Sequence, residues 1–509
     1  MEGIDMNRLR SASLVAASLV LAAGMMSAAG QSAAAEAIAT CTVNGTLVTM
    51  TTEDAYIRGT DGDDVVTCRG GVAGETALPE RTYLQTFGGN DHITVIGGSD
   101  QVASMATIEA GEGDDTIVVT GGSGKTGAPA VDAGFVSVAT GVVRGGPGND
   151  TITITGGTAS EGTSGYNAGS LGSIQGEDGD DKITVVGGAG TDRGDAGAAV
   201  LGGVSGGNGD DVIDVRGGSS PSFGGAGAIR PVGGGPGNDT ITITAGSATS
   251  PDDAAFVYAA LGSYGRVYGG TESRPDRPDT DPGNDIITIV GGSAIDPSVA
   301  GGDAITGDDR NPNAVMVDGG GGNDVVTAIG GTGPAGVGQG NTGTIQGGSG
   351  NDILDGGNGN GRLIGGEGDD ILLGGPGDDT LEGGPGADRI CGDEGALQDN
   401  VLDCTATTSS GNDTLTGDEG TDKLIGGPGN DTVDGGPDLD YLCGDRATAA
   451  TPLDDTCAGN DASDGDDTLN GGPAADTMDG QGHTDGDTGD GGPDLAVCRN
   501  IENPTRCRS

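Results

Sequence analysis

Apolar and polar residues alternate in short segments that recur along most of the chain. Each segment follows a glycine-rich turn that ends in an acidic residue, and two copies, GGPGNDTITITGG (145–157) and GGPGNDTITITAG (234–246), are almost identical. Two positions after the acidic residue stands an apolar one: Val66, Ile93, Ile117, Ile152, Ile183, Ile213, Ile241, Ile287 or Val326. Alternation with a period of two predicts short β-strands with one buried face.

A second row of apolar residues precedes the turns, two positions before each turn begins. Its members are Ile57, Leu84, Ile108, Val143, Ile174, Val204, Val232, Val317 and Ile345. The turn at Asp285 is the exception, because TESRPDRPDT (271–280) interrupts the pattern there. Disordered chains have no reason to hold such spacing, so the pattern argues against the disorder that a composition of 110 glycines, 77 acidic residues and 2% aromatics otherwise suggests.

From Gly347 the repeat shortens to nine residues. GGSGNDILD, GGNGNGRLI, GGEGDDILL, GGPGDDTLE and GGPGADRIC run head to tail to Cys391, and shorter arrays follow from Gly417 and Ala462. The stretch GQGHTDGDTGDGG (480–492) has lost the pattern.

These tandem GGxGxDxUx nonapeptides resemble the hemolysin-type, or RTX, calcium-binding repeats of secreted bacterial proteins. The resemblance covers about residues 59–497. It implies an all-β fold, a right-handed parallel β-roll or β-solenoid, with several Ca²⁺ ions as cofactors. It also implies a metal-ligand role for the sixth residue of each turn: Asp64, Asp91, Asp115, Asp150, Asp181, Asp211, Asp239, Asp285, Asp324, Asp352, Asp370, Asp379, Asp388, Asp413, Asp422, Asp431, Asp440, Asp467 and Asp476.

The residue types in the turns suit calcium. Glycine adopts positive φ without a side-chain clash and so exposes carbonyl oxygens, while calcium takes 6–8 oxygen ligands from carboxylates and carbonyls. Two turns stacked one coil apart can therefore hold one ion between them. In the nonapeptide arrays two repeats make one 18-residue coil, so Asp352, Asp370 and Asp388 line one edge. The other edge offers Asp379 and Gly361, with only Asn360 as a substitute oxygen.

The charge of the chain also favours cations as partners. A formal net charge of −55 excludes nucleic acid or an anionic membrane as an electrostatic partner. The two histidines, His92 and His483, lie in repetitive contexts that indicate a solvent-facing role. No HExxH zinc helix occurs, and we expect no catalytic activity.

The N-terminus has the order of an export signal. Arg8 and Arg10 precede the apolar run 14–26, and small residues follow through Ala35. This order predicts a cleaved signal peptide over residues 1–37, an extracellular location and no membrane span in the rest of the chain; an uncleaved anchor is the alternative.

The eight cysteines agree with export. They fall as neighbours along the chain, which favours the pairs Cys41–Cys68, Cys391–Cys404, Cys443–Cys457 and Cys498–Cys507, although eight cysteines allow 105 pairings. A zinc site is the alternative, but CxxC spacing and histidine partners are missing. The two middle pairs are expected to clamp loops that interrupt the nonapeptides, and the outer pairs to tie down the terminal coils.

The expected organisation is a signal peptide (1–37), a long-coil solenoid with one calcium turn per coil (38–345), a nonapeptide β-roll with loop insertions (346–497) and a C-terminal cap (498–509). The expected function is that of a secreted, non-catalytic calcium-binding β-roll whose folding calcium drives. Two alternatives remain, an extracellular adhesin or surface-interaction module with a cell-surface or polysaccharide ligand, and an ice-binding solenoid. The second rests on a row of outward threonines: Thr67, Thr94, Thr153, Thr184, Thr242, Thr288 and Thr327, interrupted by Val118 and Asp214.

Overall fold

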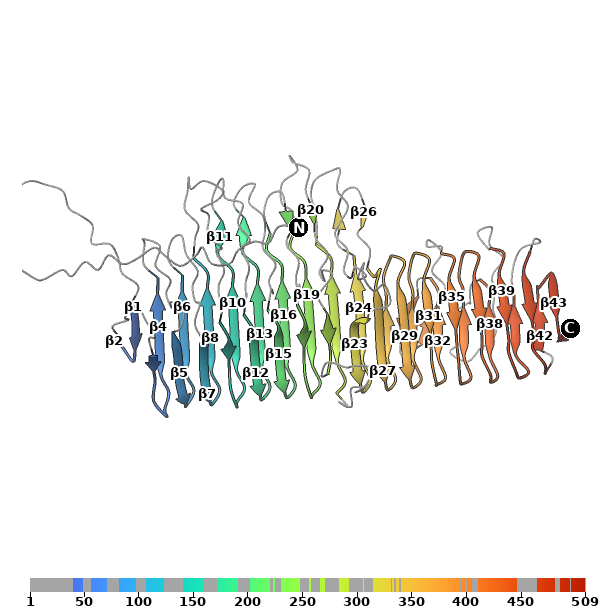
Figure 1. The fold of residues 1–509 in the computed structure, drawn as a ribbon. Coiled ribbons are helices and arrows are strands. Elements are labelled where there is room, and N and C mark those ends of the chain that lie inside the picture. The colour runs from blue at the N-terminus through green and yellow to red at the C-terminus, as the bar shows by residue number, and fades with distance from the viewer. Residues whose placement is uncertain are drawn as a thin grey trace, which may run out of the picture. The chain divides into compact units, whose positions relative to one another are not determined.

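Two parallel β-sheets face each other along the stack of coils, and each coil contributes one strand to each sheet (Figure 1). In this computed structural model the described residues belong to the compact unit Ala37–Ser509. They are 40–48, 56–70, 82–97, 107–122, 141–159, 172–190, 202–219, 223–224, 230–247, 256–257, 266–270, 283–292, 305, 315–330, 332–333, 336–337, 340–393, 395–398, 401–404, 411–445, 465–480, 486–494 and 496–508. The predicted signal peptide lies outside them.

The first sheet, sheet A, contains the strands that follow the first turn of each coil. In spatial order its strands are β2 (Thr46–Val48), β1 (Thr40–Val43), β4 (Val65–Arg69), β6 (His92–Ile96), β8 (Thr116–Thr120), β10 (Thr151–Thr155), β13 (Lys182–Val186), β16 (Val212–Arg216), β19 (Thr240–Thr244), β22 (Ile286–Val290), β24 (Val325–Ile329), β28 (Ile353–Asp355), β30 (Ile371–Leu373), β32 (Arg389–Cys391), β36 (Lys423–Ile425), β38 (Tyr441–Cys443), β40 (Thr477–Asp479), β42 (Ala496–Arg499) and β44 (Cys507–Arg508).

The second sheet, sheet B, contains the strands that precede those turns. They are β3 (Tyr56–Arg58), β5 (Tyr83–Gly88), β7 (Thr107–Glu112), β9 (Val143–Arg144), β12 (Ile174–Asp178), β15 (Val204–Asn208), β18 (Val232–Gly233), β21 (Val267–Tyr268), β23 (Val315–Gly321), β27 (Thr344–Ser349), β29 (Arg362–Glu367), β31 (Thr380–Glu382), β35 (Thr414–Thr416), β37 (Thr432–Asp434), β39 (Thr468–Asn470), β41 (Thr488–Asp490) and β43 (Asn503–Thr505).

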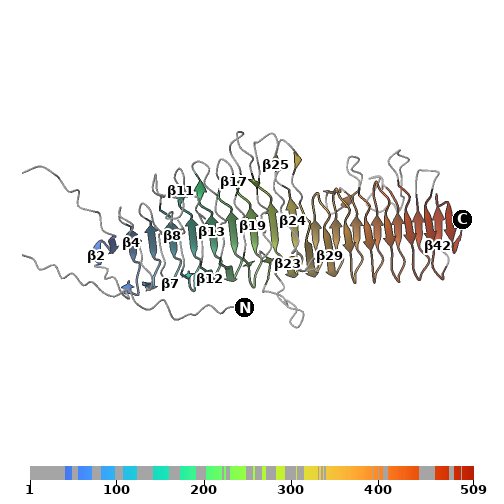
Figure 2. The same ribbon diagram turned by 45° about the horizontal axis from the view of Figure 1, so that its top comes forward.

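Four short strand pairs lie in the connections that lead from sheet A back to sheet B. Three of them stand beside the long coils, on the side where the strands of sheet A end (Figures 1 and 2). The pairs are β11 (Thr158–Ala159) with β14 (Ala189–Gly190), β17 (Phe223–Gly224) with β20 (Phe256–Val257), β25 (Thr332–Gly333) with β26 (Gly336–Val337), and β33 (Ala396–Gln398) with β34 (Val401–Asp403). Variable loops therefore join coils whose two main strands keep a constant position.

The core is a double row of apolar side chains between the two sheets. Ile152 of β10 pairs with Ile117 of β8 and Ile183 of β13, so equivalent residues stack coil upon coil. The stacked side chains are 0–1% exposed, and each buried isoleucine stabilises the fold by about 1.5–3 kcal/mol relative to an exposed one. The two apolar rows predicted from the alternation are confirmed. Val267 also belongs to the second apolar row, from which the sequence pattern omitted it. It pairs with Val232 and Val317 despite the interruption that follows it.

The coils are shorter in the C-terminal half. Ile353 pairs with Ile371 of the next coil, 18 residues later, as the nonapeptide period predicts. Here sheet A has apolar residues on its outer face as well: Leu373, Cys391, Ile425 and Cys443 align across four strands and form a small cluster with Cys404. The hairpin segment that carries Cys404 thus covers the outside of sheet A.

Disulfides join the predicted cysteine neighbours. Cys41–Cys68, Cys391–Cys404 and Cys498–Cys507 are formed, with Cα–Cα distances of 4.1, 6.0 and 5.5 Å. Cys443 is also disulfide-bonded, and its expected partner Cys457 lies outside the described residues. The prediction of local pairing is confirmed for the three pairs that the described residues contain.

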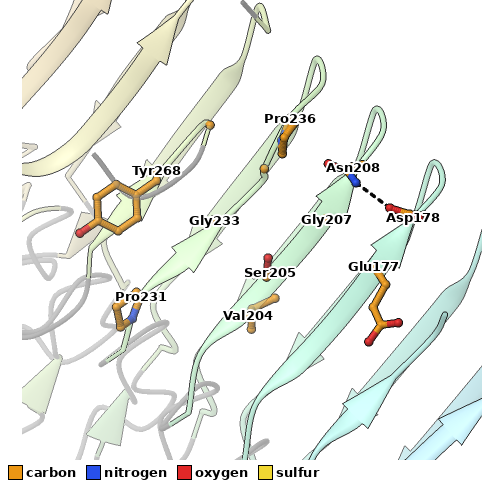
Figure 3. A pocket seen from close by; sticks show the side chains of 12 residues that line it. Glu177, Asp178, Val204, Ser205, Gly207, Asn208, Pro231, Gly233, Pro236 and Tyr268 are labelled. Carbon is orange, nitrogen blue, oxygen red and sulfur yellow. Dashed lines mark hydrogen bonds between the residues drawn. The ribbon is translucent and has the colours of Figure 1, made fainter. Parts of the chain in front are cut away.

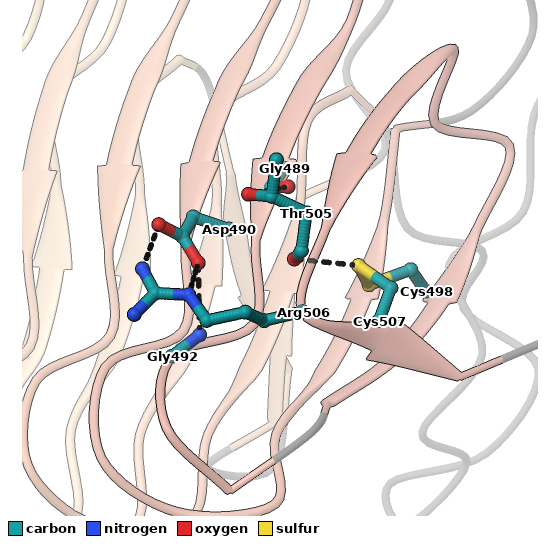
Figure 4. Close-up of a disulfide and its surroundings, with 7 residues drawn as sticks. All are labelled: Gly489, Asp490, Gly492, Cys498, Thr505, Arg506 and Cys507. Carbon is teal, nitrogen blue, oxygen red and sulfur yellow. Dashed lines mark hydrogen bonds and ion pairs between the residues drawn. A yellow bond between two sulfur atoms is a disulfide. The ribbon is translucent and has the colours of Figure 1, made fainter.

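The two ends of the stack differ from the coils between them. At the N-terminal end β1 runs antiparallel to β4 and to β2, and Cys41 is cross-linked to Cys68 of β4. At the other end the Cys498–Cys507 disulfide joins β42 to β44, and Arg506 forms an ion pair with Asp490 of β41 (Figure 4). Both outer disulfides therefore tie down terminal strands, as expected. No helix long and apolar enough to cross a membrane occurs in the described part of the chain.

Candidate metal centre

The sixth-position aspartates form two rows, one along each edge between the sheets. Every aspartate that the sequence singled out is at most 2% exposed. The first row follows the turns that lead from sheet B to sheet A, and its members are Asp64, Asp91, Asp115, Asp150, Asp181, Asp211, Asp239, Asp285, Asp324, Asp352, Asp370, Asp388, Asp422, Asp440 and Asp476. The second row follows the opposite turns and contains Asp379, Asp413, Asp431 and Asp467.

One repeated hydrogen bond builds the rows. The backbone N–H of each aspartate donates to Oδ1 of the aspartate one coil later, as Asp352 does to Asp370 at 2.8 Å. Coils as different in length as 24 and 46 residues make the same bond, because their extra residues lie in the loops. The first row is continuous from Asp64 to Asp476.

The second carboxylate oxygen, Oδ2, of most row members is buried and accepts no hydrogen bond from the described residues. Unpaired buried oxygens of this kind belong to Asp91, Asp115, Asp150, Asp181, Asp211, Asp324, Asp352, Asp370, Asp379, Asp388, Asp413, Asp422, Asp431, Asp440 and Asp476. Burying a charged oxygen without a partner is costly, so a long row of such oxygens fits a cation-binding site.

These oxygens point into the space left by a glycine. A β-carbon added to Gly365, the first residue of its turn, would lie less than 3.0 Å from Oδ2 of Asp370 and 2.6 Å from the carbonyl oxygen of Gly383 in the next coil. The same pair of a carboxylate and a next-coil carbonyl meets at Gly206, where the partners are Asp211 and Gly234. An anionic oxygen and a carbonyl oxygen facing one small space are ligands that calcium prefers, so the residues fit that ion.

The electrostatics of the rows point the same way. Burial, followed by the charges of neighbouring carboxylates, raises the pKa of Asp150 to about 8 and that of Asp370 to about 8. On the second row the same causes raise the pKa of Asp431 to about 9. Without a cation, many of these aspartate carboxyl groups would therefore be protonated near neutral pH. A bound cation would allow them to ionise fully.

The second row begins where the sequence predicts an incomplete turn. The N–H of Gly361 donates to Oδ1 of Asp379 at 2.6 Å, but Gly361 has no carboxylate to offer. Asn360 does not replace it, because its side chain is exposed and accepts from the N–H of Asp378 at 3.2 Å. The buried amide of Asn341 lies against Gly361 instead.

Residues 338–363, 364–396 and 407–442 match the family model of the RTX calcium-binding nonapeptide repeat (4 copies). The C-terminal region of this chain contains RTX repeats. The matched residues include Asp352–Asp440 of the first row and Asp379–Asp431 of the second, whereas the long coils before residue 338 lie outside the match. No curated protein matches the chain.

The second row extends further than the sequence suggested. Residues 480–492 were interpreted as having lost the pattern, and for the second half of that stretch this is wrong. Asp467 donates its N–H to Oδ1 of Asp487 at 2.9 Å, and Asp487 is 3% exposed. Its own N–H donates to Glu502 at 3.2 Å, so a glutamate ends the second row. Gly480 and Asp487 are seven positions apart instead of the usual five, and this spacing hid the turn from a pattern of fixed length.

The fifth residues of most turns form further rows of hydrogen bonds that sequence reasoning missed, although Ala387 and Ala475 offer no side-chain acceptor. In these rows the side chain accepts the N–H of the fifth residue in the next coil, as Asn323 accepts from Asn351 at 2.7 Å and Asn351 accepts from Asp369 at 3.0 Å. Fifth-position side chains thus point toward the next coil and sixth-position side chains toward the previous one. The turns often end in GND or GDD because Asn or Asp at the fifth position provides this hydrogen-bond acceptor.

Several turns of the rows are assembled from two pieces of chain. Gly269 fills the first position of the turn that ends at Asp285, and residues 271–282 separate the pieces. On the second row Gly392 and Asp393 combine with Gly411, Asn412 and Asp413 in the same way. A third pair of pieces, Gly444–Asp445 and 465–467, forms the turn that follows the uninterrupted turn 426–431 on the same row. These insertions explain the uneven spacing of the aspartates.

The outer face of sheet B carries a hollow of 520 Å³ (Figure 3). It lies where two successive strands present the small residues Ser205 and Gly233, between Tyr268 on one side and the acidic pair Glu177 and Asp178 on the other. Its rim is acidic, which disfavours anionic ligands.

Other candidate metal ligands do not converge. No group of three or more histidine, cysteine, aspartate or glutamate side chains in the described ranges is arranged to hold a metal by itself. His92 is exposed, as predicted, and His483 lies outside the described residues. A cation in the rows would consequently take much of its coordination from backbone carbonyls.

Proposed function

We propose that this protein is a secreted, non-catalytic calcium-binding β-roll whose folding is driven by calcium. The observation that carries the proposal is the row of buried Oδ2 atoms, many of which face a turn glycine and, as at Gly206, Gly365 and Gly392, a carbonyl oxygen of the next coil. The matched RTX repeats support calcium as the ion.

The coupling to folding follows from the charge of the chain. Its net charge of −55 opposes compaction, and its core has few large side chains to resist that repulsion. A calcium site needs two stacked turns, so it does not exist in the unfolded chain, and binding free energy becomes folding free energy. We expect dissociation constants of about 10⁻⁴–10⁻³ M, as in other extracellular calcium modules.

The test is a calcium titration of the purified, metal-depleted chain by far-ultraviolet circular dichroism. Strand signal should be low without calcium and should rise cooperatively in the range of about 0.1–1 mM. Magnesium at the same concentrations is the control, since it demands a smaller octahedral site. Full strand signal at pH 8 after removal of calcium would contradict the proposal.

Export is the second part of the proposal. The charged, apolar and small-residue order of residues 1–37 supports a signal peptide. The three disulfides support an oxidising compartment, because such bonds are rare in reducing cytosol. Mass spectrometry of the protein from culture medium would test both the location and the cleavage near residue 37.

Surface attachment is a second candidate function, favoured by the hollow around Ser205 and Gly233. Its acidic rim suits a neutral polysaccharide better than an acidic one. Binding to a glycan array that disappears in Gly233→Trp would support it. The threonine row does not lead us to propose ice binding, because Val118 and an Asp214–Arg216 ion pair interrupt it.

A further inference from the structure

The turn that Gly392 and Asp393 form together with residues 411–413, called the split turn below, differs from the other turns in its second residue. Unsplit turns have a backbone carbonyl at this place: a β-carbon on Gly384 would meet the carbonyl oxygen of Gly366, and one on Gly375 that of Gly357. At Gly427, the second residue of the turn that follows the split one, the nearest atoms are instead those of the Asp393 side chain, with Oδ2 at 2.6 Å. A carboxylate thus takes the place of a carbonyl.

The gap between these two turns already receives one carboxylate. Oδ2 of Asp413 and the carbonyl oxygen of Gly426 meet at the missing β-carbon of Gly392, as in the unsplit turns. Oδ2 of Asp413 is buried and accepts no hydrogen bond from the described residues. Asp393 is itself 4% exposed, so its side chain is held among the same turns rather than in solvent.

The negative charge of Asp393 acts on the aspartates of the second row. Burial, and after it the charge of Asp393, raises the pKa of Asp413 to about 8. Burial and the charge of Asp393 also raise the pKa of Asp379, in the turn before, to about 7. Asp393 therefore lies within electrostatic range of the second row on both sides of the split turn.

We propose that Asp393 and Asp413 together make the gap between the split turn and the turn 426–431 a two-carboxylate calcium site that binds more tightly than the other gaps of the second row. The proposal rests on calcium binding by the rows. Affinity for calcium rises with the number of charged ligands, and a second carboxylate adds one charge without an added turn.

Asp418 supplies a matched comparison within the chain. It is also an aspartate at the second position of a turn, but on the first row, and its backbone carbonyl rather than its side chain faces the next turn at Gly436. Its side chain is half-exposed. Asp393→Asn and Asp418→Asn therefore remove the same charge from the same position of the motif, and only the first removes a group aimed at the next turn.

The experiment is hydrogen–deuterium exchange of the full chain at increasing calcium, read by mass spectrometry in peptides that cover turns 426–431 and 435–440. In the unsubstituted protein, turn 426–431 should gain protection at lower calcium than turn 374–379. Asp393→Asn should raise the calcium concentration for half-protection of turn 426–431 about tenfold, whereas Asp418→Asn should leave that of turn 435–440 unchanged.

Three results would decide against the proposal. They are equal shifts in the two variants, no shift in Asp393→Asn, and an Asp393→Glu variant that behaves like Asp393→Asn although it keeps a carboxylate. Circular dichroism at saturating calcium checks that each variant still folds. If calcium protects neither edge of the unsubstituted protein, the calcium function itself fails, which is a different outcome from the loss of this one site.

Discussion

The backbone N–H of Asp370 donates to Oδ1 of Asp388 at 2.8 Å, one coil further along the chain, while Oδ2 of Asp388 is buried without a hydrogen bond from the described residues. One oxygen of the carboxylate thus holds the coils together, and the other is left for a cation. Substituting such a residue removes a structural hydrogen bond and a metal ligand at once.

Asp370→Ala should be more damaging than Asp379→Ala. Asp370 lies between two complete turns, those of Asp352 and Asp388, whereas Asp379 follows Gly361, which offers no carboxylate. We expect the calcium midpoint to rise about tenfold or more for Asp370→Ala and by a smaller factor for Asp379→Ala. Calcium titrations followed by circular dichroism measure both. Equal midpoints for the two variants would show that the edges are not distinct.

Gly365→Ala should block calcium binding without removing any ligand. Its new methyl group would overlap Oδ2 of Asp370 and the carbonyl oxygen of Gly383, which face each other across the glycine. Gly62→Ala is the control, because a β-carbon there has no atom within 4 Å. We expect the calcium midpoint to shift only in Gly365→Ala. The idea that ligands converge at the first glycine would be abandoned if Gly62→Ala had the same effect.

Without calcium, the fold should be more stable in acid than at neutral pH. The pKa values of the row aspartates are raised, for example to about 6 for Asp115 and to about 8 for Asp324, so the folded state binds protons that the unfolded state releases. This stabilisation is present in full below the unfolded pKa of about 3.9 and is lost as the pH rises through about 6–9.

A pH titration of the metal-depleted protein by circular dichroism should therefore show strand structure near pH 5 that disappears toward pH 8. With calcium present the dependence should reverse, since ligands must lose their protons to bind metal, and less calcium should be needed at higher pH. Strand content that increases with pH in calcium-free protein would contradict this reading of the rows.

Asn351→Ala should destabilise the stack without changing the number of metal ligands. Its Oδ1 accepts the N–H of Asp369 at 3.0 Å, so the loss leaves one backbone donor without its acceptor and should cost about 1 kcal/mol. Asn351→Asp keeps the acceptor and should be nearly neutral. Urea unfolding at saturating calcium compares the two, and an unchanged midpoint for Asn351→Ala would remove the fifth-position row as a source of stability.

Breaking Cys391–Cys404 should affect the second row first. The disulfide begins one residue before Gly392 and closes 13 residues of sequence next to the two-piece turn. In the chain-entropy model, a disulfide that closes a loop of about this size stabilises the folded state by ~3 kcal/mol. The variant Cys391→Ala with Cys404→Ala should raise the calcium needed to protect turn 426–431 in hydrogen exchange, while turns of the long coils, such as that of Asp181, should respond as before.

The stacked architecture follows from the sequence because two periods are visible in it. Alternation of apolar residues after Asp150 or Asp239 gives the strand, and glycines before those aspartates give the turn, so neither needs distant contacts to be recognised. The positions of the sixth-position aspartates in rows follow from the same local rule.

The assembled turns could not be predicted in this way. Gly392 and Gly411 meet only because the coils on either side, at Gly374 and Gly426, fix where a turn must lie, and their separation in sequence hides the motif. For the same reason Asp393 and Asp487 were missed: their role depends on which coil lies next to them, not on the spacing of nearby residues. Val267 was not recognised as a core residue from the sequence, because the turn that follows it continues only after residues 271–282.

Identical coils present the same hydrogen-bonding edge at both ends, so a stack of them could in principle grow into a filament by adding further copies. Asn44 prevents this at one end. Its Nδ2 donates to Oδ1 of Asp64 at 2.5 Å and its Oδ1 accepts the N–H of Val65 at 2.8 Å, so the first carboxylate already has the partner that a preceding coil would provide. Beside it, β1 runs against the direction of the stack and is cross-linked to it. A second molecule that approaches this end therefore meets an antiparallel strand and a carboxylate oxygen that already accepts a hydrogen bond.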